Sequence, residues 1–193
     1  MGALPVTKLT PEEYFAMDDV AEGRLEYHDG EVFPVVAATP QHALILVSTS
    51  SCLAIRLKGG PCVAGAQFRV RTTARNYVVP DIAIVCGGLI MATDAKDAVT
   101  NPKVIVEILS PSTDDFDHGG KFALYRELES FTDYILIAQD KPKVEVFHKE
   151  APNQWLLSIH DGLDADIRIE SLGIEIPAHE IYAGIEFAAT DPA

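Results

Sequence analysis

The sequence predicts an α/β fold in which a mixed sheet is flanked by helices. Apolar residues at helical spacing recur in segments that start with capping residues, and short apolar runs typical of strands lie between them. At 193 residues the chain is long enough for a substantial core. We therefore expect a single domain over residues 10–187, between a flexible N-terminus at 1–9 and a flexible tail at 188–193.

The first predicted elements are a short helix, a hairpin and a long helix. Residues 10–13 form a capping box with proline at the first helical position, which should start a helix that runs to residue 17. The segment 24–33 predicts a hairpin that turns at Asp29-Gly30. The longest helical pattern follows over 40–58 and ends at two glycines.

The remaining elements are mainly strands. Apolar runs predict four strands, at 62–72, 78–85, 104–109 and 132–138. A helix is expected between the last two of them, and a loop with one helical turn at 91–96 precedes them. Three further segments are typical of an antiparallel meander, at 143–148, 154–160 and 166–169. A final short helix is predicted at 177–182.

The charge composition limits the classes of partner. Fifteen basic residues stand against twenty-nine acidic ones, which gives a formal net charge of −14. Broad, non-specific attraction to nucleic acid normally rests on an excess of lysine and arginine. The composition therefore argues against such attraction, although it leaves room for a local basic stripe or a contact bridged by a metal.

The cysteines and the apolar runs bear on the compartment. Three cysteines are an odd number and show no Cys-x-x-Cys spacing, so we expect neither a disulfide framework nor a zinc site. A reducing cytoplasm is the simplest setting for such a chain. The N-terminus lacks the pattern of a signal peptide, and no apolar run approaches the roughly 18 residues of a membrane span. We expect a soluble, cytoplasmic protein.

Two predicted strands each carry a carboxylate. Asp81 lies in the run 78–85, and Glu107 lies in the run 104–109. An ionised carboxylate inside an apolar strand is costly unless it is paired or bound to a metal. Because side chains alternate along a strand, the two carboxylates converge if the faces that carry them coincide. Such a pair, with open positions for water, suits a hard cation such as Mg²⁺.

Lys121 is the third candidate. It shares one helical stripe with Leu124, Tyr125 and Leu128, so it should face the sheet and bring an ammonium group to the carboxylates. A purely structural interpretation is also open, in which Asp81 and Glu107 form buried ion pairs with Lys121. Periodicity alone does not choose between the two.

These residues carry a family resemblance. Pro80-Asp81, then Glu107-Ile108-Leu109, then a helical Lys121 resemble the PD-(D/E)XK nuclease superfamily, with the lysine displaced from the Leu109 position to the following helix. More closely, the chain resembles the Uma-two family of restriction endonucleases over about residues 10–187. The segments that carry this closer resemblance are 80–83, 106–113, Lys121-x3-Tyr125 and Asp133-Tyr134.

The resemblance implies a restriction-endonuclease-like fold with additional antiparallel strands, and metal-dependent hydrolysis of DNA phosphodiester bonds. Asp81, Glu107 and the carbonyl of Ile108 would hold Mg²⁺ or Mn²⁺, and Lys121 would position or activate a water. By analogy, a homodimer is favoured, because two nicks need two sites. The alternative is a catalytically silent binding or assembly module, which the net charge and Leu109 favour; a hydrolase of small phosphates is a third option.

Secondary candidates surround these three. The family tends to carry a glutamate at the position of Glu26, which would join the metal site or hold Lys121; the alternative is a cross-strand or surface charge. The family also shows a histidine near His42, a minor catalytic candidate for which the alternative is a capping or core-edge residue. Arg69 and Arg71 share one strand face and are candidate phosphate contacts, as is Ser112 before the Lys121 helix. Gln67 lies on the arginine face and is a candidate to orient a water or a backbone phosphate. Ordinary salt bridging and helix capping are the structural alternatives.

Overall fold

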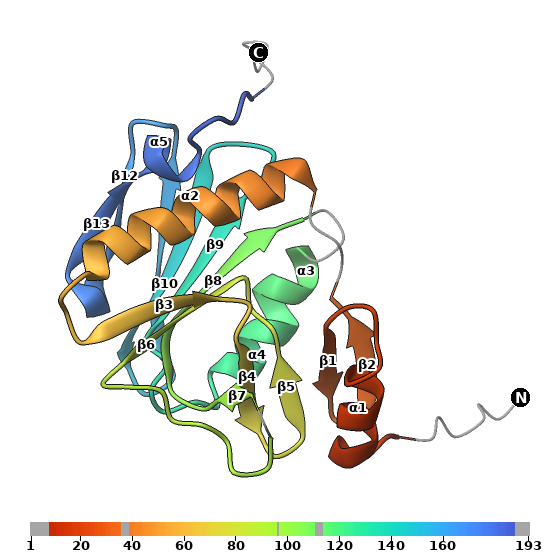
Figure 1. The fold of residues 1–193 in the computed structure, drawn as a ribbon. Helices are drawn as coiled ribbons and strands as arrows, with labels where there is room; N and C mark the ends of the chain where they lie inside the picture. The colour runs from red at the N-terminus through yellow and green to blue at the C-terminus, as the bar shows by residue number, and fades with distance from the viewer. Residues whose placement is uncertain (1–7, 36–38, 96, 111–113, 188–193) are drawn as a thin grey trace, which may run out of the picture.

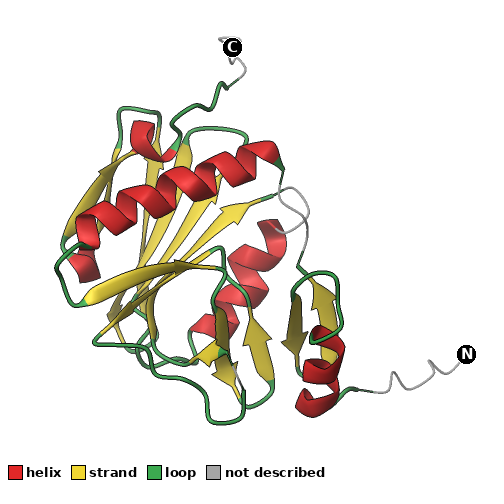
Figure 2. Ribbon diagram, in the orientation of Figure 1, coloured by secondary structure: helices red, strands yellow, loops and turns green. Residues whose placement is uncertain are grey.

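The three-dimensional structure is a computed structural model that describes residues 8–35, 39–95, 97–110 and 114–187. A six-stranded mixed sheet forms its centre (Figure 1). The long helix α2 (Pro40–Leu57) covers one face, and a helical segment that begins with α3 (Asp114–Phe116) covers the other (Figure 2). This is the mixed α/β arrangement that the sequence predicted.

The strand order of the central sheet is β11-β10-β9-β8-β6-β3. Strands β8 and β9 are parallel, and the other neighbours are antiparallel. The bounds are β3 Cys62–Ala66, β6 Ile82–Cys86, β8 Pro102–Leu109, β9 Asp133–Ala138, β10 Lys143–Ala151 and β11 Gln154–Asp161.

Strand β8 shows how the sheet separates two cores. Its residues Val104, Val106 and Ile108 pack on the face covered by α2. Ile105 and Leu109 pack on the opposite face, against Tyr125 and other aromatic residues. Because side chains alternate along the strand, Glu107 points to this second face, toward the helix that carries Lys121.

A second, five-stranded sheet supports the N-terminal part of the site. Its order is β2-β1-β5-β4-β7, and helix α1 packs on it through three stacked or tilted tyrosine rings. The capping box at Thr10 and the turn at Asp29-Gly30 form as predicted. The bounds are α1 Pro11–Asp18, β1 Leu25–His28, β2 Glu31–Pro34, β4 Arg69–Thr73, β5 Asn76–Val78 and β7 Ala98–Val99.

The C-terminal segment departs from the predicted meander. Strand β12 (Asp166–Ile169) does not continue from β11 but pairs with β13 (Ile174–Pro177) in a separate two-stranded sheet, across a short 3₁₀ turn. This small sheet and helix α5 (Ala178–Ile181) pack on the α2 side of the core. The sequence therefore predicted β12 but neither β13 nor the pairing of the two strands.

Two predicted strands are each interrupted. The run 62–72 is split at Gln67, whose φ of +52° breaks the extended backbone, and its halves β3 and β4 join different sheets. The run 78–85 is split before β6, so Asp81 precedes that strand instead of lying within it. In the loop before β8, described residues 91–95 form no helical turn, and Met91 bridges to Val99 instead.

The prediction that the cysteines form no disulfide is wrong. Cys62 and Cys86 form a disulfide across the β3–β6 pair, where the strand register places them directly opposite each other. They are separated by 24 residues in the sequence, so only the antiparallel pairing brings them together. Cys52 is free and buried.

At the N-terminus, the backbone N–H of Leu9 donates a hydrogen bond to the Gly30 carbonyl. None of the described helices is long and apolar enough to span a membrane.

Candidate active site

Asp81, Glu107 and Lys121 meet where the central sheet adjoins β5. The backbone N–H of Asp81 donates to Glu107 Oε2 at 3.2 Å, and Lys121 Nζ lies 3.2 Å from Glu107 Oε1. Asp81 Oδ2 accepts a hydrogen bond of 2.8 Å from the backbone N–H of Ile108. The three residues predicted from the sequence are therefore neighbours.

Strand pairing explains why the two carboxylates converge. Strands β6 and β8 are antiparallel, with Ile82 opposite Val106. Continuing this register by one residue places Asp81 beside Glu107. Pro80 has no backbone N–H to donate, which suits the break between β5 and β6 that turns Asp81 toward its neighbour.

Lys121 reaches the carboxylates from an irregular helix. It ends the π-helical turn η1 (Asp117–Lys121), which lies between α3 and α4 (Phe122–Tyr125). A π turn inserts a residue into the helix and is frequent at functional sites. The Lys121 ammonium group also lies 3.3 Å from Glu26 Oε1 and 3.7 Å from Asp117 Oδ1. The sequence predicted the helix and its lysine but not the π turn.

Glu26 links the two sheets. Its Oε1 accepts a hydrogen bond of 2.8 Å from the backbone N–H of Val79, and its Oε2 lies 3.4 Å from His28 Nε2. The carboxylate is almost completely buried. Of the interpretations of this residue, the structure shows the one in which it contacts Lys121.

Two members of the cluster were not predicted as site residues, although the sequence analysis placed Tyr125 on the same helical stripe as Lys121. Tyr125 donates its hydroxyl hydrogen to Glu107 Oε1 at 2.8 Å, and both groups are buried. Asp117 is buried four residues before Lys121, and its carbonyl accepts a hydrogen bond of 3.0 Å from the Tyr134 hydroxyl. Their helical spacing from Lys121, at i+4 and i−4, is the signal that could have identified them.

His42 and the backbone of Gln67 hold Asp81. His42 Nε2 lies 3.1 Å from Asp81 Oδ2, while Thr39 caps the first turn of α2 by accepting the His42 backbone N–H. The Gln67 N–H donates to the Asp81 carbonyl at 2.9 Å, but the Gln67 side chain is exposed. His42 therefore lies at the site, and Gln67 supports it through its main chain.

The arginines predicted to contact phosphate are occupied elsewhere. Arg69 is buried in the second sheet, where it pairs with Asp18 and, at 2.6 Å, with Asp97. Its guanidinium group also lies over the rings of Tyr14 and Phe15. Arg71 pairs with Asp94 at 2.9 Å. The salt-bridging alternative describes these two residues, because their charges are already partnered; Ser112 lies outside the described residues.

The electrostatics of the cluster are dominated by burial and by crowded carboxylates. Burial raises the pKa of Glu107 well above its ordinary value, against the lowering effect of Lys121, and the charge of Asp81 raises it further. Burial also opposes ionisation of Glu26, yet the hydrogen bond from His28 and the charge of Lys121 keep the Glu26 pKa below its ordinary value. Burial lowers the pKa of Lys121, but Glu107 and Glu26 more than reverse this effect. Lys121 is therefore a stable cation.

The donor atoms suit a hard divalent cation. Carboxylate and carbonyl oxygens, as offered by Asp81, Glu107 and Ile108, are the ligands that Mg²⁺ takes in proteins. Within the described part of the chain, no three Asp, Glu, His or Cys side chains are arranged to hold a metal ion. Mg²⁺ is commonly held by one or two carboxylates, with water and substrate phosphate completing its shell. The cluster fits this open kind of site and not a closed protein cage.

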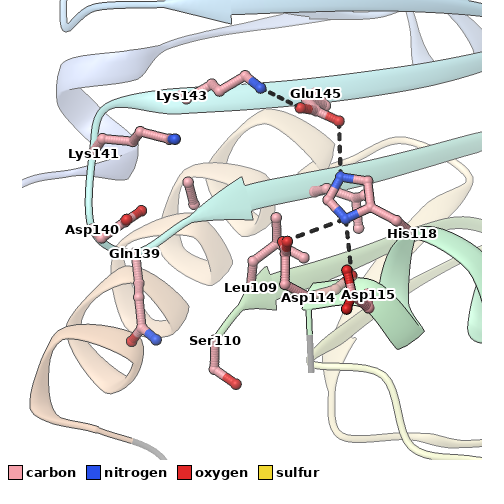
Figure 3. A pocket seen from close by; sticks show the side chains of 12 residues that line it. Leu109, Ser110, Asp114, Asp115, His118, Gln139, Asp140, Lys141, Lys143 and Glu145 are labelled. Carbon is pink, nitrogen blue, oxygen red and sulfur yellow. Dashed lines mark hydrogen bonds and ion pairs between the residues drawn. The ribbon is translucent and has the colours of Figure 1, made fainter. Parts of the chain in front are cut away.

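A cavity of about 450 Å³ lies beside the cluster, beyond Leu109 (Figure 3). None of Asp81, Glu107 and Lys121 lines it. His118 lines the cavity, and its Nδ1 lies 2.9 Å from the Asp114 carbonyl. Its Nε2 lies 3.0 Å from Glu145, which also pairs with Lys143. Burial lowers the pKa of His118, but these two acceptors raise it above its ordinary value overall. The cavity is thus a neighbour of the candidate site and not the site itself.

Comparisons with known proteins agree on the family and the fold. The model of the Uma2 family, described as "Putative restriction endonuclease", matches residues 11–178. An uncharacterised protein of Synechocystis sp. is 30% identical over 187 residues, covering 95% of this chain and 96% of its own. A second from that organism is 28% identical over 183 residues, covering 90% and 100%.

A solved structure shares the fold. The crystal structure of a "putative nuclease belonging to DUF820" from Anabaena variabilis superposes with a TM-score of 0.72. The match covers 93% of this chain and 98% of that chain at 19% sequence identity. The mixed sheet flanked by helices is therefore a nuclease-like fold.

Proposed function

The chain belongs to the Uma2 family, and on that premise we propose that it is a Mg²⁺- or Mn²⁺-dependent endonuclease that hydrolyses phosphodiester bonds of DNA. Asp81, Glu107 and the Ile108 carbonyl would hold the metal ion. Lys121, displaced to the helix after β8, would stabilise negative charge that develops on the phosphate. The observation that carries the proposal is the convergence of Asp81 and Glu107, from neighbouring strands, beside the buried Lys121 ammonium group.

The crowding of carboxylates favours a cation site over a purely structural ion pair. Glu26, Glu107 and Asp117 contact the Lys121 ammonium group, and the backbone N–H of Asp81 donates to Glu107. Without a metal ion, burial and the charge of Asp81 raise the pKa of Glu107, which favours its protonated form. A divalent cation held by Asp81 and Glu107 would instead favour the ionised form of both carboxylates.

Each residue then has a distinct role. A divalent cation, when bound, polarises the scissile phosphate and lowers the pKa of a coordinated water. The Lys121 ammonium group, held by Glu26 and Asp117, stabilises negative charge that develops on the phosphate. The Tyr125 hydroxyl fixes one oxygen of Glu107, and His42 fixes one oxygen of Asp81. These contacts leave Asp81 Oδ1 as an oxygen for the metal.

Calorimetric titration of Mn²⁺ tests the metal site without knowledge of the substrate. We expect wild type to bind about one ion and Glu107→Ala to lose binding, since one of two carboxylate ligands is gone. Glu145→Ala is the matched control, because Glu145 is a partly buried carboxylate of the neighbouring cavity. Equal binding by wild type and Glu107→Ala would contradict the proposed ligands.

The silent binding module remains the competing function, and cleavage separates the two. The net charge of −14 disfavours strong non-specific DNA binding, so assays need low salt and a range of substrates. Metal binding without hydrolysis of any DNA substrate would favour the module. Hydrolysis of a small phosphodiester but not of DNA would favour a small-phosphate hydrolase instead.

We also propose that the protein is a homodimer that packs α2 against α2 of a second copy. The solvent face of α2 is a stripe without charge, formed by Leu44, Val47, Ser51 and Ile55. A surface helix normally carries polar and charged residues on that face. In a chain with a charge of −14, copies repel each other least where carboxylates are absent. In antiparallel packing of two copies, the ends of the stripe meet, so Leu44 of one copy lies opposite Ile55 of the other.

Sedimentation equilibrium of two variants tests this interface. Val47 and Ile55 are 64% and 72% exposed, so glutamate at both positions should leave the fold intact. We expect a wild-type dimer and a monomeric Val47→Glu/Ile55→Glu variant, whereas Leu156→Glu on the distant strand β11 should remain dimeric. A dimer that survives the double change, or that dissociates only with Leu156→Glu, would place the interface elsewhere.

A further inference from the structure

Three aromatic rings form a cluster on the surface where the first hairpin meets the Lys121 helix. The His28 ring lies 5.4 Å from the Phe116 ring in a stacked arrangement and 5.0 Å from the Phe33 ring. Phe33 and Phe116 are 42% and 41% exposed, which is high for phenylalanine. The rings come from β1, β2 and α3, which lie side by side in Figure 1.

Gly120 allows Phe116 to lie against its own helix. A Cβ atom at position 120 would come within 2.2 Å of the Phe116 ring, so a side chain there would displace it. Glycine inside a helix is unfavourable compared with alanine, because it loses more backbone freedom on folding. The sequence thus keeps a helix-weakening residue at the position where Phe116 needs space.

The aromatic cluster is continuous with the candidate active site. His28 Nε2 lies 3.4 Å from Glu26 Oε2, and Glu26 Oε1 lies 3.3 Å from Lys121 Nζ. Phe116 directly precedes Asp117, which contacts Lys121 as well. A substrate whose phosphate reached Lys121 would therefore have its neighbouring nucleotide near these rings.

The charge of the protein favours stacking over phosphate contacts as a source of affinity. Arg69 and Arg71, the basic residues of the second sheet that the sequence singled out, are occupied by aspartates. Stacking of a base on an aromatic ring needs no basic residue and contributes roughly 5- to 150-fold in affinity per base. Inside a duplex the bases are stacked on each other, so only an unpaired base offers its face to a ring.

We propose that Phe33 and Phe116, supported by His28, form a stacking platform for an unpaired nucleobase beside the scissile phosphate. The preferred substrate is then single-stranded or locally unpaired nucleic acid. This inference rests on the proposed nuclease function, because that function places a phosphate at Lys121. Phe33 and Phe116 are binding residues for the nucleotide and take no part in the chemical step.

Fluorescence of 2-aminopurine tests the platform independently of cleavage, because stacking on an aromatic ring quenches this base analogue. Oligonucleotides that carry it, single-stranded or in a duplex, are titrated with the full chain in Ca²⁺ buffer. We expect quenching of the single strand and at least about ten-fold weaker binding of the duplex. Phe33→Leu and Phe116→Leu should each weaken single-strand binding by roughly 5- to 150-fold.

Matched variants separate stacking from folding. Phe33→Trp should keep the quenching, because a flat ring remains, while Phe33→Leu keeps only the apolar volume. Leu157→Ala removes an apolar side chain of similar exposure, 43%, from β11 and should change nothing. Circular dichroism of each variant checks the fold.

The outcomes distinguish this inference from the proposed function. Quenching that depends on Phe33 and Phe116 without cleavage in Mg²⁺ or Mn²⁺ would support the platform and contradict the nuclease. Cleavage with unchanged quenching and unchanged KM in both leucine variants would contradict the platform and support the nuclease. Absence of any quenching by wild type, or equal quenching of duplex and single strand, also overturns the platform.

Discussion

Two buried cations, Lys121 and Arg69, lie in neighbouring parts of this molecule and have opposite surroundings. Arg69 pairs with Asp18 and Asp97, and two aromatic rings cover its guanidinium group. Its partner Asp97 is 46% exposed, so water stabilises part of the surplus negative charge. Lys121 instead contacts three carboxylates that are all nearly inaccessible to solvent.

The difference teaches how a structural charge and a functional one can be told apart. A planar guanidinium group offers several donors in fixed directions and stacks on rings, which suits a closed pair. An ammonium group surrounded by several buried carboxylates, one of them with a raised pKa, is a setting in which a second cation can bind. We therefore propose a structural role for Arg69 and a chemical role for Lys121, and the following experiments test that proposal.

The largest contrast should appear in DNA cleavage. Glu107→Ala removes a proposed metal ligand, so we expect the rate in Mg²⁺ to fall on the order of 10³-fold or more. Asp97→Ala removes a carboxylate of comparable type next to Arg69 and should leave the rate unchanged. Initial rates on a labelled substrate measure both. Loss of cleavage in both variants would remove the distinction.

Replacement of each buried cation should lower the free energy of unfolding by different amounts at the two sites. Lys121→Met leaves several buried carboxylates without their cation and should destabilise the metal-free protein by roughly 3–5 kcal/mol in urea unfolding. Mn²⁺ at about 100 times its dissociation constant should return on the order of 2.7 kcal/mol, because it binds the folded state.

Arg69→Met is the matched change at the other site. We expect a smaller loss, about 2–3 kcal/mol, because Asp97 can be hydrated, and no recovery with Mn²⁺ beyond the gain that wild type shows. A specific recovery of Arg69→Met by Mn²⁺ would show that the second site also binds metal and would end the comparison.

Removal of one tyrosine hydroxyl at each of the two sites should have smaller effects. Tyr125→Phe removes the hydrogen bond to Glu107 and should lower kcat about ten-fold and stability by about 1–2 kcal/mol. Tyr14 packs beside Arg69 and donates to the Leu25 carbonyl at 2.8 Å, so Tyr14→Phe should reduce stability by about 1 kcal/mol and leave kcat unchanged. An unaltered kcat in Tyr125→Phe would remove the positioning role of that hydroxyl.

The smallest expected effect comes from the pair of His118 and Glu145, which is partly exposed and is compared with the two buried cations. The His118 pKa is raised in the folded state, so its contribution is complete below about pH 6.5, the unfolded value, and is lost as pH rises through the folded pKa. The Glu145 pKa is lowered, because the hydrogen bonds from Lys143 and His118 outweigh the effect of burial, so its contribution is lost as pH falls.

Urea unfolding at pH 5.5 and pH 8.5 measures this pair, which should contribute at most about 1 kcal/mol because water screens it. We expect His118→Gln to lose more stability at pH 5.5 than at pH 8.5. The opposite order would mean that His118 is held neutral in the folded protein.

Local patterns in the sequence predicted much of the scaffold. The capping box started α1 at Pro11, the turn at Asp29-Gly30 closed the first hairpin, and α2 began and ended within one residue of its predicted bounds. Alternation along 104–109 also placed Glu107 on the same face as Ile105 and Leu109. Helical spacing predicted that Lys121 faces the sheet.

Patterns of this kind were less informative where a strand changes sheets. The run 62–72 reads as one strand, because a left-handed residue such as Gln67 leaves no trace in hydrophobic alternation. The same limit applies to Arg69 and Arg71, whose shared face was predicted but whose aspartate partners lie in other elements.

The sequence by itself therefore determined most of the helices and strands, the faces of their side chains and the three residues at the centre of the candidate site, because capping, turn chemistry and periodicity act between near neighbours in the chain. Only the tertiary structure decided that Glu26 reaches Lys121, that Tyr125 holds Glu107, and that Cys62 meets Cys86. These contacts join residues 18 to 95 positions apart. They depend on strand register and on how the two sheets pack, which no local pattern encodes.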